Sequence, residues 1–372
     1  MAAKKIILIF PFNLLSHYLR CLVLADTYNK AEYSIYFLSS VSYDRFVLQH
    51  GYQTFSCQQF DVKYVMECSK KFDFSWLNKP TLDSIMLAQV AVIKQLNADL
   101  VIGDVAPTLK IAAQITGIQY VSLLNGYMTR YYALNRKISR THFIYHLLSG
   151  LPPAMVAWLT NFGENISFKK IQQPFNSLRL KYRLLPLPNY LYEIEGNINL
   201  ICDLPKLFPQ KNLPSSFQFI GPLIYQYHEE NSSWLAEIPS NKKVICISLG
   251  STGDWTKLGF LNDSYYSKYT IVATGDTDKV LSATHIVSRD FVNLAQLLKR
   301  SGLMICHGGN GTIYHGIFNQ VYMLCLSSHF EQEWNIDALE RIGYGKSADK
   351  FTEQDWKIEI EAGMMTYVSR FF

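Results

Sequence analysis

The sequence of 372 residues is short of charge, because Asp, Glu, Lys and Arg make up only 17% of it, against about 25% in a typical soluble protein. The net charge of +5 is spread without a long basic run, so charge alone does not argue for a nucleic-acid partner, and we expect none. The apolar content of 49% excludes a disordered or small disulfide-stapled chain. At roughly 150 residues per domain, the length predicts two to three domains.

Two further features are missing from the sequence. The seven cysteines form no Cys-x-x-Cys pair, and most lie inside apolar runs such as 244–247, which indicates reduced, buried thiols. No apolar run reaches the ~20 residues that a membrane span requires. The N-terminal run is interrupted at Pro11 without a signal-peptide cleavage site, and the stretch 147–159 contains two prolines. We therefore expect a cytoplasmic protein without a transmembrane helix.

Aromatic residues are abundant instead, since Tyr, Phe and Trp account for 14% of the chain. Many of them lie in two stretches of the N-terminal half, Phe60 to Trp76 and Tyr127 to Trp158. Periodicity does not separate a core face from the wall of a binding site. These stretches are therefore candidates both for the core and for a surface that binds an apolar ligand.

Short apolar runs typical of buried strands alternate with helical periodicity in the first third of the chain and again after Lys243. We predict strands at 6–10, 33–38, 100–102, 119–123, 244–249, 270–273, 285–287, 303–306 and 321–326. We predict helices at 19–28, 84–96, 108–116 and 313–318. This alternation is typical of an α/β fold with doubly wound parallel sheets.

The pattern loosens between Asn125 and Leu223, where nine of the thirteen prolines lie. We interpret this stretch as helices, loops and the approach to a linker. The simplest architecture has an N-terminal domain at 1–222, a linker at 223–242 and a C-terminal domain at 243–372. Ligands of such domains bind at the carboxyl ends of the strands.

The sharpest local feature is a glycine-rich segment between a predicted strand and a predicted helix, His307-Gly308-Gly309-Asn310-Gly311-Thr312. Glycines allow the backbone to approach a ligand closely, and amide N–H groups at a helix N-terminus form an anion site that suits a diphosphate. The alternative is a tight turn without a ligand. A second strand-end loop, Gly250-Ser251-Thr252-Gly253, favours a nucleotide site in the second domain.

Residues 304–345 resemble the donor-binding signature of the nucleotide-sugar-dependent glycosyltransferases with the GT-B fold, the superfamily of plant, macrolide and UDP-glucuronosyl transferases. The agreement runs through His307, Gly308, Gly309, Gly311, Thr312, Gln332, Asn335 and Gly343. Supporting segments follow in the family's order at 6–25, 98–104, 219–223 and 247–251. The resemblance implies two Rossmann-like domains facing a central cleft, with the acceptor bound by the N-terminal domain and the sugar nucleotide by the C-terminal one.

The resemblance also implies a catalytic pair. His17, in the loop after the first strand, matches the general base that takes the proton from the acceptor hydroxyl, a role that suits an imidazole because it titrates near neutral pH. Asp104 matches the carboxylate that orients this histidine and stabilises its imidazolium form. Without the resemblance, His17 is one of nine histidines, and Asp104 is an equally good candidate for capping the helix near Thr108.

For the donor, the resemblance implies that His307 and the amides of 308–312 hold the phosphates and stabilise the leaving diphosphate. Phe291 matches an aromatic residue that stacks on the base, although a Phe in such a run is more often part of a core. Glu331 and Gln332 match an acidic-Gln pair that contacts the sugar hydroxyls. The predicted donor-binding residues are Gly250, Ser251, Thr252, Phe291, Val292, His307, Gly308, Gly309, Asn310, Gly311, Thr312, His315, Glu331 and Gln332.

The sequence departs from the family's pattern at several positions. Ser16 stands where a Gly usually precedes the base, and Asn293-Leu294 replaces a Pro-Gln pair. His315 stands where many relatives have the Glu that grips the ribose, so the nucleotide stays open. The chain ends 27 residues after Gly345, before the long terminal helix that in relatives returns to the first domain.

One pair of aspartates has the spacing of the Asp-x-Asp motif with which another class of glycosyltransferases holds a divalent ion. Asp276-Thr277-Asp278 has this spacing, but it follows Gly275 in a polar stretch that is better interpreted as a solvated loop. No cluster of His, Cys and carboxylates has zinc spacing. We predict transfer without a metal, and with no cofactor beyond the sugar nucleotide as co-substrate.

The sequence thus predicts an inverting glycosyltransferase that moves a hexose from a UDP- or dTDP-sugar to a hydroxyl of a small, hydrophobic or aromatic acceptor. The alternatives are a nucleotide-sugar epimerase or hydrolase of the same fold, and a non-catalytic sugar-nucleotide-binding partner protein. Peripheral contact with a membrane and the oligomeric state stay open.

Overall fold

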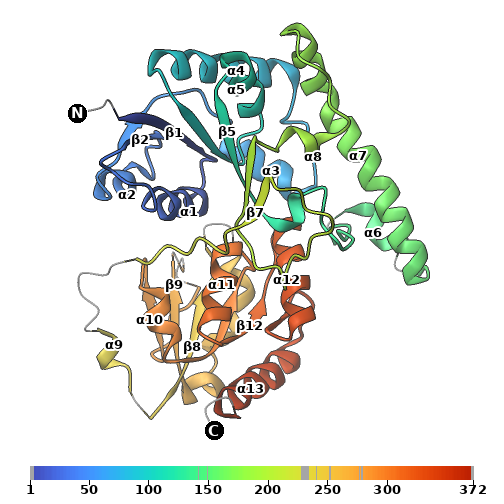
Figure 1. Ribbon diagram of the computed structural model, residues 1–372. Coiled ribbons are helices and arrows are strands. Elements are labelled where there is room, and N and C mark those ends of the chain that lie inside the picture. Colours follow the sequence, from blue (N-terminus) through green and yellow to red (C-terminus); the bar gives the residue numbers. More distant parts are fainter. Residues whose placement is uncertain are drawn as a thin grey trace. The chain divides into compact units, whose positions relative to one another are not determined.

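The computed structural model describes residues 4–140, 142–148, 150–227, 234–239, 241–250, 253–275, 277 and 280–369. The chain forms two compact units, Met1–Tyr225 and Gln226–Phe372, each built on one parallel sheet (Figure 1). The division between the N-terminal and C-terminal units falls inside the segment 223–242.

The N-terminal unit has a seven-stranded sheet with the order β3-β2-β1-β4-β5-β6-β7. Its strands are β1 (Lys5–Pro11), β2 (Tyr33–Leu38), β3 (Gln53–Phe55), β4 (Leu100–Asp104), β5 (Gln119–Leu124), β6 (Ile198–Ile201) and β7 (Phe217–Phe219). Its helices are α1 (Leu15–Ala25), α2 (Asp44–Gln49), α3 (Val62–Lys70), α4 (Lys79–Gln95), α5 (Leu109–Thr116), α6 (Phe143–Leu148), α7 (Pro153–Lys181) and α8 (Tyr190–Glu193).

Strand β1 shows why the central strands are apolar throughout. Ile7 and Ile9 pack into one apolar cluster with side chains of α1 and α2, while Leu8 and Phe10 pack into a second cluster with side chains of α4, α5 and α7. Successive side chains of a strand point to opposite faces of the sheet, so a sheet covered by helices on both faces buries both sets of side chains, here from Ile7 to Pro11.

The C-terminal unit has a six-stranded sheet with the order β10-β9-β8-β11-β12-β13. Its strands are β8 (Lys243–Ser248), β9 (Tyr269–Thr274), β10 (Ile286–Arg289), β11 (Ser301–Cys306), β12 (Tyr322–Cys325) and β13 (Gly345–Ser347). Its helices are α9 (Trp234–Glu237), α10 (Leu294–Leu298), α11 (Asn310–Phe318), α12 (Phe330–Ile342) and α13 (Glu353–Ser369). Side chains of α13 pack on the central strands from one face.

In both sheets the strand order reverses once, between β1 and β4 in the N-terminal unit and between β8 and β11 in the C-terminal unit. At such a switch point the two connecting helices leave toward opposite faces, and the strand ends between them are open to a ligand. The predicted doubly wound parallel sheets are confirmed. They place the residues after β1, β4, β8 and β11 at these two positions.

All seven cysteines are unpaired, as predicted, and six of them are buried. In the described part of the chain, no helix combines the length and apolar character needed to cross a bilayer.

Candidate active site

His17 lies in the first turn of α1, so its predicted position in a loop is wrong. The chain turns directly after β1, where the Leu14 amide donates to the Phe12 carbonyl at 2.6 Å and the His17 amide donates to the Leu14 carbonyl at 3.1 Å. The helix therefore begins four residues earlier than its apolar periodicity indicates. This early start holds the imidazole close to the carboxyl end of β1.

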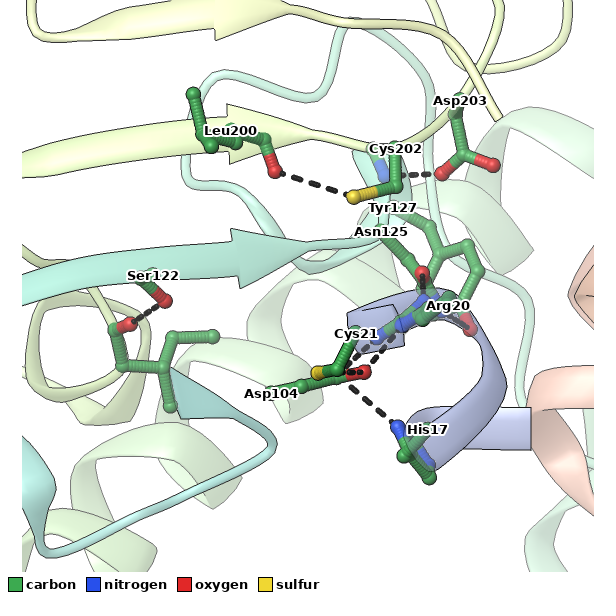
Figure 2. Close-up of polar contacts among 12 residues, drawn as sticks. His17, Arg20, Cys21, Asp104, Ser122, Asn125, Tyr127, Leu200, Cys202 and Asp203 are labelled. Carbon is green, nitrogen blue, oxygen red and sulfur yellow. Dashed lines mark hydrogen bonds and ion pairs between the residues drawn. The ribbon is translucent and has the colours of Figure 1, made fainter. Parts of the chain in front are cut away.

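Asp104 is the last residue of β4 and pairs in register with Pro11, the last residue of β1. The two strands meet at the switch point, and this brings Asp104 next to the start of α1. His17 Nδ1 lies 3.0 Å from Asp104 Oδ1, with the His17 side chain 14% exposed and that of Asp104 completely buried. The structure thus brings the two predicted catalytic side chains together (Figure 2).

The alternative role of Asp104 as a helix cap is wrong. Helix α5 begins at Leu109 after Thr108, and no side chain caps it. The Thr108 hydroxyl donates instead to Gln89 Oε1 at 2.9 Å. The Asp104 carboxylate is directed toward α1.

Arg20 is a third member of this site that the sequence did not predict. Its Nε and Nη2 donate to the two carboxylate oxygens of Asp104, and its Nη1 donates to Asn125 Oδ1 at 2.7 Å (Figure 2). Arg20 follows His17 by three residues, a spacing that places both side chains on one face of α1. That spacing was the available signal, but an arginine inside an apolar helix does not show by itself which side chain it meets.

The charges at this site are buried and mutually neutralised. Burial alone would raise the pKa of Asp104, but the charge of Arg20, then that of His17, and their hydrogen bonds outweigh it and lower the pKa to about 2. Cys21 Sγ lies 3.9 Å from Asp104 Oδ2, and burial together with this carboxylate raises the pKa of the thiol. Near neutral pH the site therefore holds a carboxylate, a guanidinium and a neutral thiol around the imidazole.

An apolar surface adjoins the imidazole. The Phe12 and His17 rings are edge to face, with centroids 6.0 Å apart. Phe12 belongs to an apolar cluster that also contains Phe60, Trp76 and Met128, so both aromatic stretches predicted from the sequence contribute to it. Trp76 is buried in this cluster, and the aromatic stretches are therefore partly core.

In the C-terminal unit, the glycine-rich segment follows β11 at the switch point. Cys306 pairs in register with Ser248 of β8, and His307 Nδ1 lies 3.3 Å from the Ser248 carbonyl oxygen. Burial lowers the pKa of His307 despite this contact. The imidazole is therefore neutral near neutral pH and adds no resident charge to the segment.

The backbone of this segment requires glycine at two positions. Gly308 has φ +77, and a Cβ there would lie 2.8 Å from Ile336 Cγ1. A Cβ on Gly309 would lie 2.3 Å from His307 Nε2. Helix α11 begins at Asn310, so Asn310 to Thr312 form its first turn, and no side chain caps it. Amides of such a turn can bind an anion.

The other predicted donor residues have mixed surroundings. Phe291 is 42% exposed and so is not core, and its ring centroid lies 5.8 Å from that of Tyr227. Val292 is buried. Gly250, with φ +60, follows β8 beside the His307 ring. Ser251 and Thr252 lie outside the described residues.

Helix α12 packs against the glycine-rich segment and contacts its backbone. Asn335 Nδ2 donates to the Gly308 carbonyl at 2.9 Å. Gln332 is buried, and its Oε1 accepts from the amide and hydroxyl of Ser328 at 2.7 and 2.9 Å. Glu331 is half-buried in the first turn of the same helix. The contact of Glu331 and Gln332 with a sugar stays a prediction, as does any role of the half-buried His315 on α11.

Within the described residues, no three His, Cys, Asp or Glu side chains lie where they could share a metal ion. Asp276 and Asp278 of the Asp-x-Asp motif lie outside those residues.

No family model matches the chain. The PGL/p-HBAD biosynthesis rhamnosyltransferase of Mycobacterium bovis (strain BCG / Pasteur 1173P2) is 24% identical over 353 residues, which cover 92% of this chain and 76% of that protein. A second protein of that strain, named an inactive PGL/p-HBAD biosynthesis glycosyltransferase, is 23% identical over 257 residues, which cover 67% of this chain and 68% of that protein.

Solved glycosyltransferases have a similar fold over nearly the whole chain. The spinosyn rhamnosyltransferase SpnG has a TM-score of 0.68 at 14% identity, covering 98% of this chain and 92% of that one. The glycosyltransferase VinC, solved in complex with dTDP, has a TM-score of 0.62 at 18% identity, covering 98% and 95%. The fold is GT-B, as the sequence predicts.

Proposed function

We propose that this glycosyltransferase of the GT-B fold is an inverting enzyme that moves a hexose from a UDP- or dTDP-sugar to a hydroxyl of a small, lipophilic or aromatic acceptor. The buried pair of His17 and Asp104, in contact at 3.0 Å, is the observation that carries this proposal. The rhamnosyltransferase names of a curated relative and of a structural neighbour support a deoxyhexose as one candidate sugar.

The reaction is a single displacement at the anomeric carbon. Nδ1 of His17 faces Asp104, so Nε2 is the atom that accepts the proton of the acceptor hydroxyl. As this proton leaves, the hydroxyl oxygen forms a bond to the anomeric carbon, and the bond from that carbon to the diphosphate breaks. One displacement inverts the anomeric configuration. The Asp104 carboxylate stabilises the imidazolium that forms, and Arg20 positions this carboxylate by two hydrogen bonds.

The leaving nucleoside diphosphate gains negative charge in the transition state. We assign its stabilisation to His307 and to the amides in the first turn of α11, because amides that are already oriented need no reorganisation when the charge develops. Phe291, which is exposed, would stack on the base. Transfer without a metal ion is part of the proposal.

The test is His17→Ala, assayed by mass spectrometry with UDP- and dTDP-linked glucose and rhamnose against phenol, sterol, carotenoid and macrolide acceptors. Transfer should fall by about a thousandfold or more, because the base is lost, while calorimetry should show unchanged affinity for the nucleotide. The matched control is His50→Ala, since His50 Nδ1 lies 2.9 Å from Asp26 Oδ2 in the more exposed His–Asp pair of this unit. Unchanged turnover of His17→Ala would contradict the assignment of His17 as the general base.

A non-catalytic sugar-nucleotide-binding protein is the second candidate, favoured by the relative named inactive. Nucleotide affinity without glycoside formation across the whole acceptor panel would support it. A hydrolase or epimerase is distinguished in the same assay, because it would consume or convert the sugar nucleotide in the absence of any acceptor.

A further inference from the structure

The N-terminal half of α7 carries an apolar stripe that no described residue covers. Its members are 37% to 65% exposed and recur every three to four residues: Leu151, just before the helix, then Met155, Trp158, Phe162 and Ile166. This spacing places all of them along one side of the helix. Leu147 of α6, at 72% exposure, adds a sixth apolar side chain just ahead of them.

The stripe is not a frayed end of the core. The C-terminal half of α7 packs into the unit through Phe168, Ile171, Phe175 and Leu178, which are all buried. At about 3.6 residues per turn, the stripe lies roughly opposite these core-facing side chains. The rings of Trp158 and Phe162 are stacked with centroids 5.7 Å apart, so they form a continuous aromatic surface. An apolar face of this size marks an interaction site.

Exposed basic residues follow the stripe along α7. Residues 105–192 contain one acidic residue, Glu164, and ten basic ones, but four of the ten are paired with carboxylates: Arg130 with Glu195, Arg136 with Glu164, Arg179 with Glu193 and Lys181 with Asp83. The ten are Lys110, Arg130, Arg136, Lys137, Arg140, Lys169, Lys170, Arg179, Lys181 and Arg183. Lys169 and Lys170 are exposed and follow Ile166 by three and four residues, so they continue the stripe by one turn.

We propose that this stripe, defined by Leu147, Leu151, Met155, Trp158, Phe162 and Ile166, docks on an anionic lipid bilayer. An interfacial helix combines one apolar, aromatic face with lysines whose stems lie along the membrane and whose ammonium groups reach the headgroups. Tryptophan favours this interface because its ring is apolar and its N–H polar. Lys169 and Lys170, which are exposed, supply the attraction to anionic headgroups.

Charge also decides against a second copy of the chain as the occupant of this surface. A symmetric pairing through α7 would bring the exposed Lys169 and Lys170 of two copies toward one another, and like charges across an interface are unfavourable. The docking itself is independent of the proposed function. One consequence rests on that function: an enzyme docked in this way would meet a lipophilic acceptor where such a molecule is concentrated.

The test is co-sedimentation of the full chain with vesicles of phosphatidylglycerol and phosphatidylcholine in equal parts, compared with vesicles of phosphatidylcholine alone. The wild type should prefer the anionic vesicles, and this preference should fall as salt rises. The double variant Trp158→Ser, Phe162→Ser should have an affinity for the anionic vesicles that is lower by about tenfold or more, because both rings are lost from the interface. Lys169→Glu with Lys170→Glu should weaken binding and flatten its salt dependence.

The matched control is Val41→Ser with Leu48→Ser, which removes two exposed apolar side chains elsewhere on the same unit and should bind like the wild type. Circular dichroism and thermal unfolding check that each variant is folded. Brominated phospholipid should quench the fluorescence of Trp158, and this quenching should disappear in Trp158→Phe while binding persists.

Equal binding to both vesicle types, or wild-type binding by Trp158→Ser, Phe162→Ser, would overturn the proposal. A vesicle-independent dimer in sedimentation velocity that this variant abolishes would also overturn it and assign the stripe to a second copy. None of these readouts uses glycosyl transfer, so failure here is distinguishable from failure of the proposed function.

Discussion

In the N-terminal unit the switch point is crowded with buried charge, whereas in the C-terminal unit the same position holds a neutral imidazole and backbone amides. Arg20 and His17 both contact Asp104, while Gly250 and Gly309 leave no room for a side chain beside the His307 ring. The first arrangement fits a group that must accept a proton, because the ion that forms has its counter-charge ready. The neutral imidazole and amides of the C-terminal unit fit a ligand that is itself negatively charged, such as a diphosphate.

A second comparison, within the N-terminal unit, separates position from chemistry. Arg179 and Glu193 also form a buried ion pair, with Nη1 and Oε1 2.9 Å apart. Burial raises the pKa of Glu193 despite Arg179, whereas the pKa of Asp104 is lowered. Asp104 differs in its hydrogen bonds, because both of its carboxylate oxygens accept from Arg20, whereas Glu193 accepts one hydrogen bond from Arg179 and one from Gln172. The Arg179 pair therefore serves as a reference for a buried ion pair without a catalytic role.

The largest effect is expected for Asp104→Asn. The amide cannot stabilise the imidazolium, so kcat should fall by about a thousandfold or more, while calorimetry should give wild-type affinity for the nucleotide. Circular dichroism controls for folding, because Arg20 loses its buried partner. If the variant kept its kcat and lost nucleotide affinity, this would contradict the assignment of proton transfer to the N-terminal unit and of nucleotide binding to the C-terminal unit.

Arg20→Met should have the next largest effect, a fall of roughly ten- to a hundredfold in kcat/KM. The carboxylate of Asp104 would then be neutralised by His17 alone and would favour its protonated, inactive form. The midpoint of the acid limb of the kcat/KM profile should therefore move to higher pH. The variant should lose more activity below neutral pH than above it.

Arg179→Met is the control for Arg20→Met. Each leaves a buried carboxylate without its arginine, so each should lose about 3–5 kcal/mol of unfolding free energy, measured by urea denaturation. Only Arg20→Met should shift the pH profile. Identical profiles would reduce Arg20 to a structural role.

Gly309→Ala tests the glycine-rich segment at the switch point of the C-terminal unit. The new Cβ would displace the His307 ring, and we expect nucleotide affinity to fall roughly tenfold by calorimetry. Gly259→Ala is the control in the same unit, because a Cβ there would lie at an ordinary 3.8 Å from Val280 Cγ1. Equal affinities for the two variants would contradict an anion site at this segment.

The smallest effect is expected for Phe291→Ala. Stacking on a base is worth most when the ring is enclosed, and this ring is 42% exposed, so we expect nucleotide affinity to fall about fivefold. Phe318→Ala removes another exposed ring of the unit, at the far end of α11 from the glycine-rich segment, and should leave the affinity unchanged.

The strands beside the two switch points, such as β1 and β8, were predictable because they are buried on both faces and read as nearly continuous apolar runs. The edge strands β3, β7 and β13 were not, since three residues are too few to show a period. Helix α7 was hidden by prolines: Pro153 occupies its first turn, where the missing N–H costs nothing, and Pro174 lies inside it.

The site was predictable only where a motif specified it. His17 and Asp104 are 87 residues apart in the sequence, and the resemblance, rather than their spacing, paired them. Arg20 lies in the segment 6–25 that resembles the family, but the resemblance gave it no role, and its partner is fixed by the register of β1 against β4. Tertiary contacts of this kind are set by the sheet and leave no local signal.

Helix α7 has 29 residues, which makes it about 44 Å long at a rise of 1.5 Å per residue. Its C-terminal half is packed into the core, so its N-terminal half is a rigid extension of the unit and not a flexible linker. With a bilayer bound along the stripe, this rigid half of α7 would set the height of the His17 imidazole above the lipid. Acceptors would then be selected by reach, that is, by how far their hydroxyl stands out from the membrane, as well as by the shape of any pocket.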